Sequence, residues 1–450
     1  GYWLLTQWAL HIRKAVERRG NDRFTPLVAN PWPVPLLHPI QAAAGLLYLV
    51  TLFTIRFMIQ LLSSRRGLSW LTAMVVRQQL KASKDAMEPL NLEAQKSLEE
   101  GATLDLSIEI ELSEIHGLHS DWLESRRRGL VALIGDRGVG KSRLMQGLVG
   151  SLEEEQRQRT PLARIQCPMR SMNEKEALQW LAQSLSLELS SPSSEELLAA
   201  LQAMPSRFIA VDDLHQSFRR SVGGFEGLVS LLEIMHASSE VHFWMVNLHE
   251  PAWVYLKGVP GAVNLSVFRE QVLLRRLSAE DASAWLEGRA QSRGLFLDYG
   301  RLVGEVLPGV DRERAVSRAR EAFWRLLVQH SQGNPRILLL YWMRSLFAHE
   351  QENSIHTSLF DAPVVTDLKS VGDLELFVLT ALIIHDGLHL DDISAVLNLS
   401  EDECRSLCRT LESRGILRAE DQGRRFSVEL SWLPAVERLL QQKHFLYAQH

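Results

Sequence analysis

One short glycine-rich segment constrains this chain more than any other feature. Residues 135–142 read Gly-Asp-Arg-Gly-Val-Gly-Lys-Ser, which fits the pattern G-x-x-x-x-G-K-S, and the apolar run 130–134 leads directly into them. The pattern predicts a strand that ends at Ile134, a loop, and a helix that begins near Lys141. In such a loop the backbone N–H groups converge, and the helix N-terminus adds partial positive charge. The segment therefore predicts a binding site for the phosphates of a nucleotide.

The residue types in this segment suit phosphate binding. The glycines allow a tight backbone path, Lys141 would reach the β- and γ-phosphates, and the Ser142 hydroxyl would ligate Mg²⁺. The alternative is a chance glycine-rich loop, which the preceding apolar strand disfavours. We expect these residues to bind the nucleotide: Gly135, Asp136, Arg137, Gly138, Val139, Gly140, Lys141, Ser142 and Arg143.

Length and composition set the outer limits of the prediction. A chain of 450 residues exceeds what one hydrophobic core usually organises, so we expect roughly three structural units. The net charge of −5 gives no overall basic footprint for nucleic acid, although a local basic patch stays possible. The three cysteines fit neither a metal motif nor a disulfide framework. Cys404 and Cys408 are one helical turn apart, which we interpret as an ordinary helix face rather than a redox pair.

Residues 40–62 form an apolar run long enough to span a bilayer as a helix, with Arg56 as its one charge. Arg65 and Arg66 follow, and such a basic flank predicts that the C-terminal side faces the cytoplasm. Basic residues also precede the run, so the charge asymmetry is not clean. We therefore expect a transmembrane or re-entrant helix at 40–62, with an interfacial amphipathic helix and a buried core helix as the alternatives.

Further along the chain, apolar strands alternate with helical patterns, which predicts a parallel sheet covered on both faces. The run 207–213 ends in Asp212 and Asp213, two carboxylates at a strand end. Asp212 would hold Mg²⁺ through water, and Asp213 would orient or deprotonate the attacking water. The following strand, 241–249, carries Asn247, whose amide would point at the γ-phosphate; an ordinary strand-end cap is the alternative. The period-two run 103–112 predicts a further, half-buried strand.

The turn before residue 335 completes the motif set. Gly333 and Asn334 supply a bend, and Pro335 begins a new helix that carries Arg336. Together, these elements resemble the AAA+ ATPases of the initiator type, whose relatives include the ExeA-type secretion ATPases, the transposition-regulator ATPases and the STAND signalling ATPases. The resemblance implies that Asn247 is sensor 1 and that Arg336 is sensor 2, which reaches from a helical lid to the γ-phosphate. No guanine-reading N-K-x-D element is present, so ATP with Mg²⁺ is the expected ligand.

The resemblance gives no secure arginine finger. Arg219, Arg220 and Arg269 are candidates, and each is better interpreted as surface charge. Since a finger contributes on the order of 10³ to 10⁵ in rate, ring assembly and hydrolysis rate stay open.

The C-terminal stretch from residue 374 has the element order of a winged helix, which the initiator-type ATPases also carry. Its candidate recognition helix, 401–414, opens with Glu401, Asp402 and Glu403, which would meet DNA phosphates with acid. We therefore favour a protein contact over DNA binding for this module.

These inferences combine into one predicted organisation. The fold class is α/β: a P-loop NTPase parallel sheet with a helical lid and a C-terminal winged-helix domain, preceded by a helical, membrane-associated N-terminal segment. The predicted boundaries are 1–70 for the membrane-associated region, 71–111 for a linker, 112–278 for the ATPase core, 279–365 for the lid and 366–450 for the winged helix.

The predicted function is that of a membrane-anchored ATPase at the bacterial inner membrane. Its ATPase would face the cytoplasm and drive conformational change or assembly of a protein partner complex, with a homo-oligomer as one possible form. The alternatives are a STAND-like ATP-dependent signalling switch and a DNA-binding initiator or transposition-type ATPase.

Overall fold

The computed structural model has a unit boundary between residues 86 and 87, and the described residues belong to the second unit, 87–450. Within the second unit, the structure describes these segments: 90–102, 106, 108–125, 127–151, 159–259, 261–303, 311–349 and 353–446. The predicted membrane segment 40–62 lies outside the described residues. Among the described residues, no helix is both long and apolar enough to cross a membrane.

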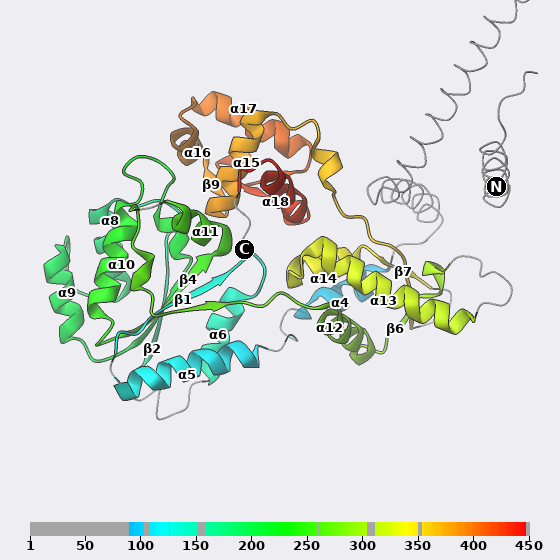
Figure 1. Ribbon diagram of the computed structural model, residues 1–450, viewed down its shortest axis with the longest axis horizontal. Coiled ribbons are helices and arrows are strands. Elements are labelled where there is room, and N and C mark those ends of the chain that lie inside the picture. The colour runs from blue at the N-terminus through cyan, green and yellow to red at the C-terminus, as the bar shows by residue number, and fades with distance from the viewer. Residues whose placement is uncertain are drawn as a thin grey trace, which may run out of the picture. The chain divides into compact units, whose positions relative to one another are not determined.

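A five-stranded parallel sheet forms the centre of the described unit (Figure 1). Its strand order is β2-β3-β4-β1-β5. The strands are β1 (Leu130–Gly135), β2 (Leu162–Gln166), β3 (Phe208–Asp212), β4 (Phe243–His249) and β5 (Glu270–Leu273). Every residue of β1, β3 and β4 is buried, as expected for parallel strands whose two faces are both covered. The predicted parallel α/β sheet is confirmed.

Alternate residues of β1 belong to two different cores, one on each face of the sheet. Val131 and Leu133 point to the first face of the sheet. Leu130, Ala132 and Ile134 point to the second face. The first face is covered by α5 (Glu109–Ser125) and α6 (Lys141–Ser151). The second is covered by α8 (Glu174–Ser184), α9 (Ser194–Ala203), α10 (Glu226–Ser238) and α11 (Glu250–Gly258).

The predicted strand 103–112 is wrong at its C-terminal end, because α5 begins at Glu109. The segment 108–115 carries apolar residues at helical spacing, namely Ile108, Leu112 and Ile115. Ile115 is buried against the sheet. A Cβ added at Gly147 of α6 would lie 2.9 Å from Cδ1 of Ile108. The helical face prevails because it packs against α6 and the sheet, which an isolated strand could not do.

Helices and a small sheet follow the central sheet and form the lid. The helices are α12 (Ala279–Ser292), α13 (Arg312–Ser331) and α14 (Pro335–Met343). The sheet has the order β6-β8-β7 and contains β6 (Phe296–Asp298), β7 (Leu346–Ala348) and β8 (Ser354–Thr357). No sequence pattern described above predicts this sheet. The upstream helix α4 (Leu92–Glu99) packs here too, since Leu98 is fully buried in the same core and Trp285 Nε1 donates to the Ala102 carbonyl at 3.0 Å.

The C-terminal module combines helices with a three-stranded antiparallel sheet of order β10-β11-β9. Its elements are α15 (Asp373–His385), β9 (Leu388–His389), α16 (Leu390–Leu397), α17 (Glu401–Ser413), β10 (Leu417–Glu420), β11 (Arg425–Val428) and α18 (Leu433–Gln442). The predicted capping box opens α17, because Ser400 and Glu403 exchange bonds of 3.0 and 3.3 Å. Cys404 and Cys408 are buried on α17, on an ordinary packed helix face.

The lid and the C-terminal module share one apolar core. Tyr341 of α14 contributes to this core, and its hydroxyl donates to the Ser431 carbonyl at 2.6 Å. Burial raises the pKa of Tyr341 above the usual range of a phenol, so the hydroxyl stays a donor. The element that carries Arg336 is therefore packed directly against the C-terminal module.

Candidate functional site

The glycine-rich loop connects the buried strand β1 to α6, as the sequence predicts. Gly138 and Gly140 have φ of +87° and +115°, a backbone region that side chains rarely adopt. A Cβ added at Gly138 would lie 2.9 Å from the Arg336 Cβ and 3.1 Å from the Asn334 Oδ1. Glycine at 138 is thus required both by the loop conformation and by the close approach of the lid.

Lys141 occupies the first position of α6 and is 8% exposed. Its Nζ donates to the carbonyls of Gly135 at 2.7 Å and Asp136 at 2.9 Å. Burial lowers the pKa of Lys141, and nearby carboxylates, with Asp386 the strongest, partly offset this shift. The ammonium group is therefore held by loop carbonyls that a phosphate oxygen could replace. Ser142 follows on α6 and lines the same cavity.

The paired carboxylates lie at the end of β3 and have different surroundings. Asp212 is 1% exposed and accepts a hydrogen bond from Arg164 Nη2 at 2.9 Å. Asp213 has a left-handed backbone with φ of 53° and accepts from Gln166 Nε2 at 3.1 Å. Burial, followed by repulsion from Asp212, raises the pKa of Asp213. Asp212 is ion-paired with Arg164, whereas Asp213 faces the cavity and binds a proton more readily than a free aspartate does.

Asn247 lies between the phosphate loop and the carboxylates because β4 is the strand between β1 and β3. Its Nδ2 donates to the Asp212 Oδ1. Asn247 is fully buried, and its Oδ1 has no hydrogen-bond partner among the described residues. A buried amide oxygen without a partner is costly, so this group needs a ligand or a water to satisfy it.

Arg336 reaches the site from the lid. Asn334 caps α14 through its Oδ1, which accepts from the backbone N–H of Arg336 at 3.1 Å, while its Nδ2 donates to the Arg137 carbonyl at 2.8 Å. The Arg336 side chain is exposed and lines the cavity beside Gly138. One side-chain amide therefore fixes both the lid helix and the phosphate loop.

A cavity of about 1280 Å³ joins these parts. The loop residues 137–143, Asp213 and Arg336 line it, and so do Asp386 and Arg418 of the C-terminal module. Asp212 and Asn247 lie behind this lining, as the bond between them requires. The sequence-predicted residues thus come together at one site with two layers.

Sequence reasoning missed several charged groups at this site. Arg276, three residues beyond β5, contacts Asp136 at 2.6 Å and Glu250 at 3.2 Å. Burial raises the pKa of Asp136 to about 6, and Glu250 adds to the shift while Arg276 opposes it. Glu437 of α18 is buried, and this burial raises the pKa of its carboxyl well above the usual range. The available signal is the pair Arg275-Arg276 directly after the short apolar run 272–274.

Arg137 of the phosphate loop contacts the C-terminal module. Its guanidinium lies 3.7 Å from Asp386 and 3.9 Å from Glu420, and its Nη1 donates to the Val428 carbonyl at 3.4 Å. Side-chain exposures of 24–28% make each ion pair only partly shielded from water.

The arginine-finger candidates stay unassigned. Arg219 pairs with Asp392 of the C-terminal module at 3.0 Å, and the backbone N–H of Arg220 donates to His385. Arg269 is exposed beside the first residue of β5. Arg219 thus has a partner within its own chain.

One family model matches the part of the chain that carries this geometry. Residues 124–250 match the model of the family described as AAA domain. This part of the chain is an AAA domain. The predicted P-loop ATPase of the AAA+ class is thereby confirmed, and the match covers the phosphate loop, both carboxylates and Asn247. No curated protein matches the chain.

Several solved structures are similar to the chain at low identity. The Cdc6p structure from Pyrobaculum aerophilum is 14% identical, with 74% of this chain and 94% of that chain covered and a TM-score of 0.34. The ORC1 protein of Aeropyrum pernix, solved in complex with DNA, is 15% identical, with coverages of 78% and 97% and a TM-score of 0.36. The RuvB Holliday junction branch migration motor of Thermotoga maritima is 13% identical, with coverages of 73% and 94% and a TM-score of 0.28.

The substitution Gly138→Ala tests the close approach of lid and loop. We expect it to lower the free energy of unfolding by about 1–2 kcal/mol, because an L residue at this φ is strained, and to weaken ATP binding by displacing Arg336. Urea unfolding and equilibrium binding of ATP measure the two effects.

Gly288→Ala in α12 is the matched control. A Cβ there meets nothing within 4 Å, and alanine is the better helix former by about 0.5–1 kcal/mol, so stability rises and ATP binding is unchanged. Equal effects of the two substitutions would contradict the requirement for glycine at 138.

Proposed function

We propose that this protein binds and hydrolyses Mg-ATP and uses the nucleotide to change the position of its lid and C-terminal module. The carrying observation is the single cavity lined by the AAA domain, the lid and the C-terminal module together. A ligand at that position contacts all three parts, so it favours whichever arrangement gives it the better contacts.

The residues of the cavity suit Mg-ATP. The loop amides and Lys141 would hold the phosphates, and Ser142 and Asp212 would hold Mg²⁺, with Asp212 acting through water because both of its oxygens already accept hydrogen bonds. Mg²⁺, when bound, would neutralise charge on the phosphate oxygens. The remaining loop residues supply backbone contacts. The fit rests on the glycine path, the displaceable Lys141 bonds and the unsatisfied Asn247 oxygen.

For hydrolysis we assign three roles. Asp213 orients or deprotonates the attacking water, since it lines the cavity and burial raises its pKa above that of a free aspartate. Asn247 positions Asp212 from the buried layer, and its amide oxygen needs a water that enters that layer to satisfy it. Arg336 brings a positive charge to the γ-phosphate from the lid.

The substitution Asp213→Asn separates binding from chemistry. We expect ATP turnover to fall by about 10²- to 10⁴-fold, the usual range for loss of general-base assistance, while ATP affinity changes little. Phosphate release and equilibrium binding are the measurements. Asp121→Asn, at an exposed position on α5, serves as the control and should keep full turnover. Unchanged turnover in Asp213→Asn would remove the assignment.

We also propose that the C-terminal module is a winged helix that contacts protein. Its support is the order of helices and strands around the antiparallel sheet β10-β11-β9. The first turn of α17 carries Glu401, Asp402 and Glu403, which disfavours insertion between DNA phosphates. Duplex binding with a steep salt dependence would instead favour an initiator-type function.

The ion pairs of Arg137 favour a second candidate function, a STAND-like switch. In the described arrangement, Asp386 and Glu420 of the C-terminal module hold a residue of the phosphate loop. ATP would compete with these carboxylates for the same cationic surroundings. In this second candidate function, the protein hydrolyses ATP slowly and signals when bound ATP releases the C-terminal module from the phosphate loop.

The substitution Asp386→Asn tests that competition. We expect ATP affinity to rise by a few-fold, because removal of a partly exposed charge is worth about 0.2–1 kcal/mol. Asparagine tolerates the left-handed backbone of residue 386, so the fold is kept. Titration with ATP provides the readout.

Asp421→Asn is the matched control, since Asp421 is also left-handed but is exposed and does not line the cavity. An unchanged or lower affinity of Asp386→Asn for ATP would count against the competition.

The site of action is also a proposal. We infer from residues 40–62 that the chain is anchored in the inner membrane with the ATPase facing the cytoplasm, where it acts on a protein partner complex. We expect the full chain to stay in the membrane fraction after alkaline carbonate extraction, since an apolar helix is not removed by high pH. A variant that lacks 40–62 should be released. Release of the unaltered chain would contradict the anchor.

A further inference from the structure

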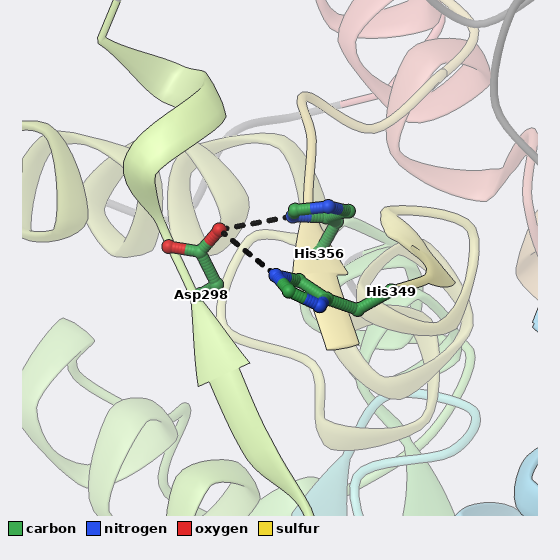
Figure 2. Close-up of side chains that lie close together, drawn as sticks. All are labelled: Asp298, His349 and His356. Atoms are coloured by element: carbon green, nitrogen blue, oxygen red, sulfur yellow. Dashed lines mark hydrogen bonds and ion pairs between the residues drawn. The ribbon is translucent and has the colours of Figure 1, made fainter. Parts of the chain in front are cut away.

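Two histidines and one aspartate converge on the small sheet of the lid, away from the groups assigned to ATP. Figure 2 shows the side chains of Asp298, His349 and His356 directed toward one another. The Asp298 Oδ2 lies 2.9 Å from the His356 Nδ1 and 4.0 Å from the His349 Nε2. One ligand atom from each residue lies within 4.8 Å of the others. In the part of the chain that the structure describes, this is the one group of three such residues.

The sheet brings these residues together from three segments. Asp298 ends β6 and is paired in register with His356 of β8. His356 in turn is opposite Phe347 of β7, and His349 directly follows that strand. The cluster therefore depends on the β6-β8-β7 pairing and not on any local sequence motif.

The carboxylate is held in a fixed orientation. The Asp298 Oδ1 accepts the backbone N–H of Gly300 at 2.8 Å, which leaves Oδ2 facing the two imidazole rings. A ligand whose second oxygen is fixed by a neighbouring group is the arrangement found around protein-bound metals. The histidine side chains are largely shielded, at 18% exposure for His349 and 12% for His356, whereas Asp298 is 41% exposed and gives access from solvent.

An ordinary hydrogen bond between an aspartate and a histidine would explain why one imidazole ring faces Asp298, but not why both rings do. Here the ring centroids of His349 and His356 are 4.0 Å apart at an interplanar angle of 40°, with a nitrogen of each ring facing the same oxygen. The positive charge of Arg301 lies near His356 and would repel a bound cation. Because the Arg301 side chain is exposed, solvent screens this repulsion.

We propose that Asp298, His349 and His356 bind a divalent transition metal of the Zn²⁺ class. Two imidazole nitrogens and one carboxylate oxygen are a ligand set that suits Zn²⁺ and disfavours Mg²⁺ or Ca²⁺. Zinc–ligand distances of about 2.0–2.2 Å place tetrahedral ligand atoms roughly 3.4 Å apart. The His349 nitrogen must therefore come closer to Asp298, and the 2.9 Å pair of Asp298 and His356 must open slightly, which side-chain rotation supplies. Water completes the coordination.

The metal would connect the two ends of the lid. The segment from Asp298 to His356 contains α13 and α14, and Arg336 lies on α14. A metal that joins β6 to β7 and β8 closes this segment into a loop and lowers the entropy of its unfolded state. The site thus stabilises the lid without touching the nucleotide.

Zinc titration of the chelator-treated full chain tests the site. In excess Mg²⁺, which occupies the carboxylates of the nucleotide site, calorimetry should show one equivalent of Zn²⁺ bound and a raised Tm. Co²⁺ should give the visible absorption of a tetrahedral nitrogen and oxygen site. His349→Ala and His356→Ala should each weaken Zn²⁺ binding at least tenfold, since even outer-shell changes cost about 10–100-fold.

His444→Ala is the matched control, because His444 is exposed on the C-terminal module and should leave Zn²⁺ binding unchanged. Asp298→Asn, which keeps the side-chain size, removes the carboxylate ligand and should also weaken Zn²⁺ binding. Circular dichroism of the metal-free variants checks that each of them still folds. Absence of a bound equivalent, or equal binding by the cluster variants and His444→Ala, overturns the proposal. These measurements need no ATP, so they are independent of the proposed ATPase activity.

Discussion

The position of β4 between β1 and β3 is the constraint on which the whole site depends. Parallel strands end at the same edge of a sheet, so this order brings the phosphate loop, Asn247 and the paired carboxylates to one edge. The bond from Asn247 to Asp212 then fixes the buried layer of the site. Because the layer is buried, its geometry is set by sheet register and not by flexible side chains. Lys141 and Arg336, which line the cavity, belong to the outer layer.

Three cations at the site have hydrogen-bond or ion-pair partners within the chain. Lys141 is held by loop carbonyls, Arg137 by Asp386 and Glu420, and Arg276 by Asp136 and Glu250. A polyphosphate at this position would compete with acidic groups from the AAA domain and the C-terminal module alike. The free energy gained when it binds would therefore be reduced by the ion pairs that break. Some of these pairs, those of Arg137 with Asp386 and Glu420, hold the C-terminal module. This is a physical basis for linking nucleotide state to the position of that module.

Local patterns made much of this structure predictable. The strand before Gly135 and the one before Asp212 are apolar runs with polar ends, and the cap at Ser400 is a four-residue motif, so each is specified by adjacent residues. The segment from Ile108 to Leu112 fits both a strand and a helix pattern, and only packing against α6 decides between them.

Features that depend on distant pairing could not be read from the sequence. Each strand of the β6-β8-β7 sheet has only three or four residues, too few for a period to emerge. The contacts of Arg137 with Asp386 and Glu420 require the C-terminal module to dock, and no local pattern encodes docking.

The helix α14 gives the lid a direct mechanical connection between its two functional ends. Its N-terminus is capped by Asn334, which also bonds the phosphate loop, and its C-terminus lies three residues before β7. Nine residues at the usual rise span about 13 Å, and a helix of this length behaves as a rigid body. Because Tyr341 packs the same helix against the C-terminal module, a shift of Arg336 toward or away from a phosphate cannot be absorbed within α14. It must move the small sheet, the C-terminal module, or both, and a sheet tied by a metal would direct the motion to the module.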